Sequence, residues 1–325
     1  MKVALVTGAG GWIGLELVKS LLTEGYTVKA LVRKNNKELD NIKKYYNDKL
    51  HIILGDMVEL DNWKDELYGV DSLFHLAAKV HSKPKTKADE DEFYLINRDC
   101  TNKLFDYAIE YNLKKVIFVS TVAVYGNHGE NSIDINTHRI PKTPYAISKN
   151  QAEMYGLDLY KEKGLPISIV QPVTVYGGKD RGNFKKLYNL ANKGVLIRFG
   201  NGLNKKSIIY YKDLVKMILN ISEDKNTSGK IFICGTENIE YNIILKKIKQ
   251  NCPNTLKIYL GDRISKVIIN ILNNLNISIL SNLSKNIETL RSNNIYDIND
   301  SLKYINRGEI TMFESWKCNE EYGKR

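Results

Sequence analysis

Short apolar runs alternate with amphipathic stretches through the first two thirds of the chain. The apolar runs are rich in β-branched residues and lack polar alternation, which is typical of strands buried on both faces of a sheet. Between them, apolar residues recur at helical spacing, as in Trp12–Thr23 and Cys100–Tyr111. This alternation of strand and helix predicts an α/β fold with a doubly wound parallel sheet. The predicted strands are Lys2–Val6, Thr27–Val32, His51–Leu54, Ser72–Leu76, Lys115–Ser120 and Ile167–Gln171.

The rhythm changes after Tyr176. Apolar runs become fewer and lie among polar, Asn-rich sequence, and no low-complexity linker separates the two regions. We therefore expect a smaller mixed α/β lobe over residues 177–325, interleaved with a first domain over residues 1–176 to which residues 230–236 return. The elements predicted in this region are a helix over Phe184–Lys193, a glycine-rich turn over Phe199–Gly202, and strands over Ser207–Tyr211 and Lys230–Cys234.

The composition is that of an ordinary globular protein. Of the 325 residues, 43% are hydrophobic and 26% are charged, which excludes a disordered, collagen-like or coiled-coil chain. The four cysteines are scattered, without a CxxC pair or a histidine cluster beside them. We therefore expect no metal site and no disulfide framework, and this cysteine usage predicts a reduced, cytoplasmic protein.

No segment reads as an export signal or a membrane span. The chain starts with a strand that enters a glycine turn, and no run of about 18 apolar residues occurs. Asparagines interrupt the most apolar candidate, Val267–Leu283, and we expect it to be a helical segment of the lobe.

The formal net charge of +11 favours phosphate-bearing partners. The basic residues are spread along a sequence that is rich in Lys, Asn and Ile throughout, and no nucleic-acid-binding motif accompanies them. Background composition therefore explains the charge better than nucleic-acid binding does.

The first predicted strand runs into the turn Thr7-Gly8-Ala9-Gly10-Gly11-Trp12-Ile13-Gly14. Ile13 stands where the GxGxxG fingerprint has its third glycine, and the sequence instead fits GxxGxxG on Gly8, Gly11 and Gly14. Such glycines allow a tight turn and let the backbone approach a pyrophosphate. The N–H groups of the helix that begins at Trp12 and Ile13 would face the phosphates. This turn, at the first strand–helix junction, predicts a dinucleotide-binding, Rossmann-type domain over residues 1–176.

The end of the second strand bears on the choice between NAD and NADP. An acidic residue there pairs with a free ribose 2′-hydroxyl, but this strand ends Leu31-Val32-Arg33-Lys34. A cation suits a 2′-phosphate, so Arg33 favours NADP, and a solvated basic loop is the alternative. We expect Asp56 and Met57, after the third strand, at the adenine edge.

A Tyr-x-x-x-Lys pair, Tyr145 and Lys149, follows Pro144 at the start of a predicted helix. Residues four apart share a helix face. An ammonium beside a phenol lowers the phenol pKa, which would make Tyr145 an acid/base near neutrality. Lys149 could also hold the nicotinamide ribose. The glycine turn upstream, and Ser120-Thr121 at the end of the fifth strand, strengthen this otherwise common motif.

With these residues in place, the chain resembles the extended short-chain dehydrogenase/reductases, the nucleotide-sugar epimerase/dehydratase superfamily. The matching segments run through almost the full length. They are TGAGGWIG, GDMVE, FHLAAKV, INRDCT, FVSTVAVYG, PYAISKNQAE, IVQPVTVYGG and KSIIYYKDLV.

The resemblance implies roles for individual residues. Thr121, five residues before the glycine of VYG, corresponds to the catalytic Ser/Thr of the family and would also contact the substrate. The cofactor contacts that it implies, besides those already named, are Leu76, Ala77, Ala78, Asn97 and Pro172.

The segment GGKDRGNFKKLYNLANKG, followed by RFGNGLNKKSIIYYKDLV, looks like the one that grips a UDP-sugar in related enzymes. By that likeness Asn183 contacts the diphosphate, Lys206 replaces the usual arginine, and Arg291 supplies a second phosphate contact. Lysine lacks the bidentate phosphate recognition of arginine. The Gly-Tyr-Pro pattern common near the end of the family's chains is missing from Ile310–Arg325.

The resemblance predicts an NAD(P)-dependent NDP-sugar 4-epimerase, acting on a UDP-hexose or UDP-N-acetylhexosamine through a transient 4-keto intermediate. The alternative is an NADPH-dependent 4-ketoreductase of an NDP-deoxysugar or another carbonyl substrate. A dehydratase is disfavoured because Val122 and Ala123 follow Thr121, where that branch has acidic residues. The complete set of Thr121, Tyr145 and Lys149 disfavours a non-catalytic protein on the same fold. The expected partner is a UDP-linked nucleotide sugar of polysaccharide biosynthesis, and a homodimer is compatible with the resemblance.

Overall fold

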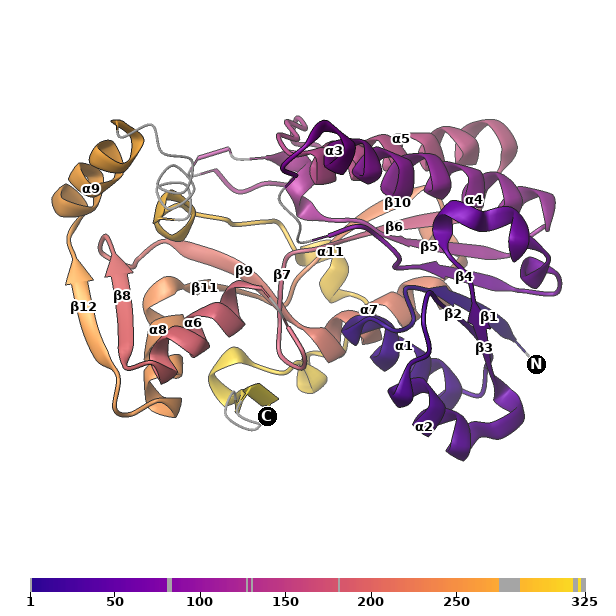
Figure 1. The fold of residues 1–325 in the computed structure, drawn as a ribbon, viewed down its shortest axis with the longest axis horizontal. Helices are drawn as coiled ribbons and strands as arrows, with labels where there is room; N and C mark the ends of the chain where they lie inside the picture. The colour runs from indigo at the N-terminus through magenta and orange to yellow at the C-terminus, as the bar shows by residue number, and fades with distance from the viewer. Residues whose placement is uncertain are drawn as a thin grey trace.

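The computed structural model describes residues 2–80, 84–126, 128–129, 131–180, 182–274, 287–317 and 321–322. At its centre is a seven-stranded sheet, parallel throughout, with the strand order β10-β6-β5-β4-β1-β2-β3 (Figure 1). The order reverses between β1 and β4, which is the switch point of a doubly wound fold. The predicted fold class is therefore confirmed. The strands are β1 Val3–Thr7, β2 Thr27–Val32, β3 Leu50–Leu54, β4 Ser72–His75, β5 Lys115–Val119, β6 Ile167–Pro172 and β10 Lys230–Cys234.

Helices cover both faces of this sheet. The helices α1, α2 and α7 share a core with one face, whereas α4 and α5 share a core with the other and α3 lies beside α5 (Figure 1). Local sequence sets the helix ends, as in α5, where Thr143 caps a first turn that starts with Pro144 and Gly164 ends the helix at a φ of 72°. These helices are α1 Trp12–Thr23, α2 Lys37–Tyr46, α3 Lys87–Tyr94, α4 Cys100–Glu110, α5 Pro144–Lys163 and α7 Tyr211–Glu223.

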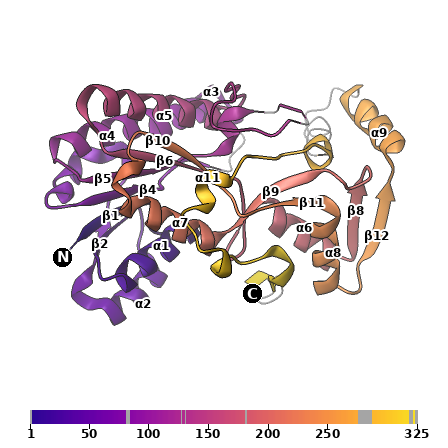
Figure 2. The same cartoon turned by 180° about the vertical axis from the view of Figure 1, so that it is seen from behind.

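A second lobe is built on two small sheets (Figure 2). In one, β9 pairs antiparallel with β11 and parallel with β7; in the other, β12 pairs in parallel with β8. Aromatic rings fill its core, with Tyr176 packed against Phe184, Phe313 and Trp316. The strands and helices of this lobe are β7 Thr174–Tyr176, β8 Val195–Phe199, β9 Lys205–Tyr210, β11 Glu237–Glu240, β12 Leu256–Leu260, α6 Asn183–Asn192, α8 Tyr241–Asn251 and α9 Asp262–Asn274. The short helix α11 Asn299–Leu302 packs against β10 of the large sheet.

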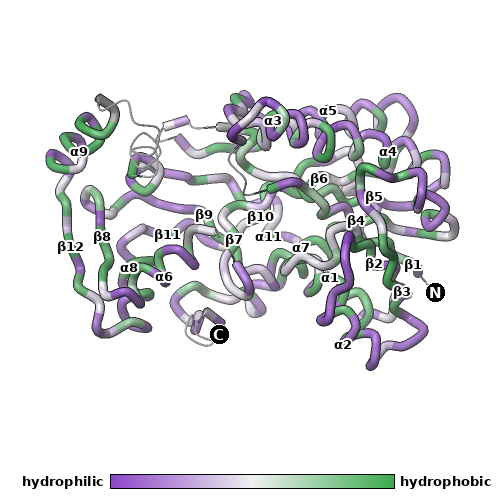
Figure 3. The backbone as a smooth tube through the Cα atoms, viewed as in Figure 1, coloured by the Kyte–Doolittle hydropathy of each residue, from purple (hydrophilic) through white to green (hydrophobic). Residues whose placement is uncertain are grey.

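The chain passes between these two parts more than once. After β6 it enters the lobe at β7, and α7 returns to pack against α1 and the large sheet. β10 then adds an edge strand beside β6 before β11 goes back to the lobe. Figure 3 shows the apolar residues concentrated along the strands of the large sheet, as expected for strands buried on both faces.

Several expectations concern features that the structure describes only in part. The beginning of Val267–Leu283 lies in α9, and residues 275–283 lie outside the described residues. Within the described ranges, no helix is long and apolar enough to cross a membrane. Cys100, Cys234 and Cys252 are buried free thiols, and Cys318 lies outside those ranges. No group of His, Cys, Asp and Glu in the described part of the chain could hold a metal ion.

Candidate active site

The glycine turn joins β1 to α1 at the carboxyl edge of the large sheet. Gly8 has a φ of 70°, and its carbonyl oxygen accepts a hydrogen bond from the Gly11 N–H at 2.9 Å. A Cβ on Gly14 would lie 2.3 Å from that same oxygen, so no side chain fits there. The helix begins with Trp12 and Ile13, and no side chain of the described residues caps its N-terminus. This cradle of backbone fits the pyrophosphate of a dinucleotide.

Leu76, Ala77 and Ala78 follow β4 and lie against this turn. The Ala77 N–H donates to the Thr7 hydroxyl at 3.2 Å. A Cβ on Gly8 would be 2.8 Å from the Ala77 nitrogen, so the two backbones are in direct contact. The expected lining of the cofactor site is therefore continuous with the glycine turn.

Asn97 holds the next residues of that segment. It is fully buried in a π-helical turn over Leu95–Asp99. Its Oδ1 accepts from the Lys79 N–H at 2.7 Å, and its Nδ2 donates to the Lys79 carbonyl at 3.1 Å. The same amide nitrogen donates to the Ser148 hydroxyl of α5 at 3.3 Å. Asn97 thus fixes the expected cofactor lining relative to α5.

The other expected cofactor positions lie at strand ends. Arg33 follows β2 and is exposed, and Pro172 ends β6. Asp56 follows β3 and accepts from the Val58 N–H at 3.2 Å, with the buried Met57 beside it. Because all these strands run parallel to β1, their ends lie along the same edge of the sheet as the glycine turn.

Tyr145 and Thr121 meet near the end of β5. Thr121 precedes the helical turn Val122–Tyr125, and its hydroxyl accepts from the Ala123 N–H at 3.1 Å. Tyr145 lies in the first turn of α5, in hydrogen-bonding contact with Thr121. Burial raises the pKa of Tyr145 to about 12, and the Thr121 contact opposes this rise. Burial and the Thr121 contact therefore act on the Tyr145 hydroxyl in opposite directions, and the role of Tyr145 as an acid/base near neutrality stays a prediction.

Lys149 lies one turn further along the same face of α5. Its side chain is buried, its Nζ donates to the Val119 carbonyl at 2.7 Å, and it lies 3.8 Å from the centre of the Phe118 ring. Burial lowers the pKa of Lys149 to about 7, and the charge of Glu153 acts in the opposite direction. The ammonium is therefore close to losing its proton at neutral pH.

Sequence reasoning missed a buried polar network next to Lys149. Glu153 is fully buried, and it accepts from Arg139 Nη1 at 2.9 Å and from Gln171 Nε2 at 2.8 and 3.0 Å. The Tyr125 hydroxyl in turn donates to Gln171 Oε1 at 2.9 Å. The spacing of four residues from Lys149 to Glu153 could have revealed the carboxylate. Its partners, however, lie on other elements.

His75 was also missed, although it stands in the quoted segment FHLAAKV. It is fully buried at the end of β4, with Nδ1 2.7 Å from the Thr7 hydroxyl and Nε2 2.9 Å from the Thr101 hydroxyl. Burial lowers the pKa of His75 well below its usual value, so the ring is neutral. It links β1, β4 and α4 beneath the glycine turn.

The three residues expected at the nucleotide lie in the second lobe. Asn183 begins α6, and its side chain lies outside the described residues. Lys206, on β9, donates to the backbone carbonyls of Thr289 at 2.7 Å and Ser292 at 2.6 Å, and burial lowers its pKa to about 8. Arg291 forms an ion pair of 2.8 Å with the aspartate that begins α9. Lys206 and Arg291 are therefore both paired with other residues of the protein. The sequence could not reveal these pairings because the partners are distant along the chain.

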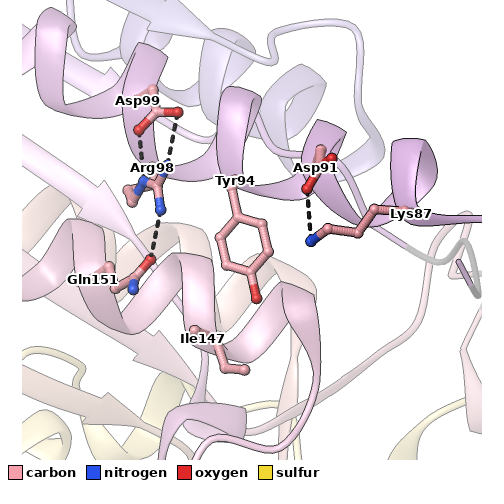
Figure 4. A pocket seen from close by; sticks show the side chains of 7 residues that line it. All are labelled: Lys87, Asp91, Tyr94, Arg98, Asp99, Ile147 and Gln151. Carbon is pink, nitrogen blue, oxygen red and sulfur yellow. Dashed lines mark hydrogen bonds and ion pairs between the residues drawn. The ribbon is translucent and has the colours of Figure 1, made fainter.

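A surface hollow of about 590 Å³ lies between α3, the turn that follows it and α5 (Figure 4). Its residues from α5, Ile147 and Gln151, project away from the face that carries Tyr145 and Lys149. Its charged side chains interact with one another or with Gln151. The hollow is therefore separate from the candidate active site. It is lined by Lys87, Asp91, Tyr94, Arg98, Asp99, Ile147 and Gln151.

Comparison with known sequences adds the following similarities. The family model for the NAD dependent epimerase/dehydratase family matches residues 4–235. UDP-glucose 4-epimerase of Vibrio cholerae is 29% identical over 238 residues, which are 71% of this chain and 70% of that protein. Human dTDP-D-glucose 4,6-dehydratase is 28% identical over 256 residues, 75% of this chain and 71% of that protein. Cinnamoyl-CoA reductase 1 of Petunia hybrida is 31% identical over 193 residues, 54% of this chain and 55% of that protein.

Solved structures share the fold. UDP-glucuronic acid 4-epimerase from Bacillus cereus, in complex with NAD, has a TM-score of 0.76 at 23% identity and covers 99% of this chain and 97% of its own. UDP-N-acetylglucosamine 4-epimerase from Methanobrevibacter ruminantium M1, in complex with UDP-N-acetylmuramic acid, has a TM-score of 0.68 at 25% identity. That match covers 81% of this chain and 86% of the other.

Proposed function

This chain belongs to the NAD-dependent epimerase/dehydratase family, and we propose that it is a UDP-sugar 4-epimerase. The observation that carries the proposal is the contact of Tyr145 with Thr121. Tyr145 shares one face of α5 with Lys149, and Thr121 follows β5 at the edge of the sheet where the glycine turn lies. The similarity to 4-epimerases of UDP-glucose and UDP-N-acetylglucosamine supports a UDP-hexose or UDP-N-acetylhexosamine as substrate.

In the proposed reaction, Tyr145 acts as a phenolate and takes the proton of the sugar 4-hydroxyl, while Thr121 donates a hydrogen bond to the same oxygen. The glycine turn and Lys149 would hold a bound nicotinamide cofactor, which would supply a hydride acceptor and then a hydride donor at C4, on opposite faces of the sugar ring. Tyr145 then returns its proton to the C4 oxygen, so the protein ends each turnover unchanged. A charged Lys149 favours the phenolate form of Tyr145 throughout.

We further propose that residues 1–176 with residues 230–236 hold the cofactor, and that residues 177–325 bind the nucleotide sugar. The pairing of β10 with β6 supports this division. Asn183, at the start of α6, and the two cations Lys206 and Arg291 are the proposed diphosphate contacts. Lys206 would exchange one backbone carbonyl for a phosphate oxygen.

A second candidate function is an NADPH-dependent 4-ketoreductase, in which Tyr145 would give a proton to the substrate carbonyl. The exposed Arg33 at the end of β2 favours it, because a cation there suits a 2′-phosphate. A reductase among the relatives, cinnamoyl-CoA reductase 1, also supports it.

One experiment distinguishes the two functions. The purified protein is denatured and any released nicotinamide cofactor is identified by mass spectrometry. Native protein is then incubated, without added cofactor, with UDP-glucose, UDP-N-acetylglucosamine and their 4-epimers. An epimerase carries its cofactor and interconverts a pair without a net change in reduced-nicotinamide absorbance. A ketoreductase is purified mostly without bound cofactor and consumes NADPH stoichiometrically with a keto-sugar. Failure to interconvert any pair, even with NAD added, would rule out the epimerase for these sugars.

A further inference from the structure

Glu153 is a carboxylate buried in the middle of α5. None of its surface is exposed, and its partners come from two other parts of the chain: Arg139 from the loop before α5, and Gln171 from β6. Arg139 is itself anchored by a 2.8 Å hydrogen bond to Asn150. A buried carboxylate is costly unless it is paired, and an apolar side chain would fill the same volume without that cost. Burial raises the pKa of this carboxyl, whereas the charge of Arg139 and the hydrogen bonds from Ser120 and Gln171 act in the opposite direction. The charged form of Glu153 therefore depends on these partners.

The charge lies one helical turn beyond Lys149, on the helix face that starts with Tyr145. Glu153 makes its ion pair with Arg139, and the Lys149 ammonium bonds to the Val119 carbonyl. The carboxylate therefore acts on Lys149 through space, across a region that water does not reach. In so dry an environment charges interact far more strongly than at the surface.

The other groups that face Lys149 cannot replace this effect. From β5 it meets the Phe118 ring and a backbone carbonyl, both uncharged. From β4 the nearby titratable group is His75, which is neutral and, if charged, would repel the ammonium. Arg139 also carries a positive charge. Among the described residues around Lys149, Glu153 supplies the negative charge.

We propose that Glu153 is a positioning residue that keeps Lys149 charged at neutral pH, and that Arg139 and Gln171 hold its carboxylate in place for that task. This inference rests on the proposed roles of Tyr145 and Lys149. Burial alone drives Lys149 toward the neutral amine, and a neutral amine cannot stabilise the Tyr145 phenolate. Glu153 acts against burial and so preserves the acid/base function of a residue that it does not touch.

The test measures the ionisation of Lys149 directly. Protein labelled with ¹³C at the lysine Cε is titrated from pH 5 to pH 10 by NMR, and the Lys149 signal is assigned by its loss in Lys149→Met. Glu153→Gln removes the charge and keeps the shape, and it turns one of the two acceptor oxygens into an NH₂ donor. Glu162→Gln, at an exposed carboxylate on the same helix, is the matched control. Thermal unfolding of each variant reports any structural damage separately.

In Glu153→Gln, the midpoint of the Lys149 titration is expected to fall by about one pH unit, as for the loss of a nearby opposite charge. In Glu162→Gln the midpoint should not change. Glu153→Asp keeps a carboxylate but withdraws it by one methylene, so an intermediate midpoint is expected; this variant decides the question if the glutamine variant does not fold. An unchanged midpoint in the folded variants would overturn the proposal and leave Glu153 a structural residue. The alkaline limb of kcat/KM should move with the midpoint. If no UDP-sugar is turned over but the midpoint still shifts, the proposed function fails and this inference stands.

Discussion

Gly14 lies directly against the carbonyl oxygen of Gly8, so close that a Cβ on Gly14 would stand 2.3 Å from that oxygen. The obstacle is backbone, and it cannot move aside as the end of a flexible side chain can. The contact therefore fixes how near α1 approaches β1, and with it where the N–H groups of the first helical turn point.

Gly14→Ala is accordingly expected to push α1 away from β1. We expect NAD affinity to fall by about tenfold or more and the free energy of unfolding to fall by about 1–3 kcal/mol, the usual range for overpacking. Titration calorimetry and urea denaturation measure the two effects. Gly308→Ala is the control, since a Cβ there meets nothing within 4 Å. Wild-type affinity in Gly14→Ala would mean that the cofactor does not depend on this turn.

Tyr145→Phe removes the proposed acid/base proton and one contact with Thr121. Turnover is expected to fall by roughly 100- to 10,000-fold, the range for a general acid–base group, while cofactor binding and thermal stability stay close to those of the wild type. Steady-state kinetics with the UDP-sugar pairs gives the result. Tyr155→Phe, on the same helix as Tyr145, loses a hydrogen bond of 2.8 Å to Asp106 of α4 and should remain active. Near-normal turnover in Tyr145→Phe would remove this residue from the mechanism.

Arg33→Asp tests the cofactor preference. A carboxylate at the end of β2 pairs with a ribose 2′-hydroxyl and repels a 2′-phosphate, so the variant should bind NAD better relative to NADP. The ratio of the two dissociation constants is the measurement. Lys44→Asp, at an exposed position of α2, changes the net charge equally and should leave the ratio alone. If the ratio is the same in both variants, the basic end of β2 is a solvated loop.

Three buried lysines predict how stability depends on pH. Burial lowers the pKa of Lys149 to about 7 and those of Lys115 and Lys206 to about 8, whereas an unfolded lysine titrates near pH 10.4. From about pH 7 to pH 10 the unfolded chain therefore binds more protons than the folded chain, and the free energy of unfolding should rise with pH. Above that range the buried tyrosines, such as Tyr145 with its raised pKa, reverse the trend.

Urea denaturation at pH 7, 8 and 9 measures this slope. Lys149→Met removes the lysine with the lowest pKa, so the slope of its stability with pH should be shallower than that of the wild type. A wild-type stability that stays flat or declines over this range would contradict the assignment of these lysines.

The large sheet was predictable because its central strands are largely buried and are therefore rich in apolar and β-branched residues. The small sheets were harder. β12 has only exposed and partly buried residues, and β11 carries a glutamate at each end, so neither matches the pattern of a buried strand. Lys230–Cys234 was recognisable because it has the same apolar character as the central strands.

In the candidate site, too, some residues were predictable from the sequence and others were not. Short-range patterns identified the glycine turn and the Tyr145–Lys149 pair, since their spacing alone places them on one turn or one helix face. What surrounds them was not readable, because Glu153 depends on Arg139 and Gln171, and Lys206 on a segment some 80 residues later in the chain. The effect of burial on the pKa of Tyr145 was not readable for the same reason, since burial is set by the whole fold.

The place of β10 beside β6 has a consequence for how the protein is made. On the ribosome, β6 emerges long before its edge partner, and the chain between them forms β7, α6, β8, β9 and α7. Until residue 234 has left the exit tunnel, β6 presents an unpaired parallel edge, which is a template for association with other nascent chains. Such distant pairing also makes sheet completion slow. The second lobe is therefore not one continuous segment of the chain, and any graft of this lobe must rejoin the chain on both sides of β10.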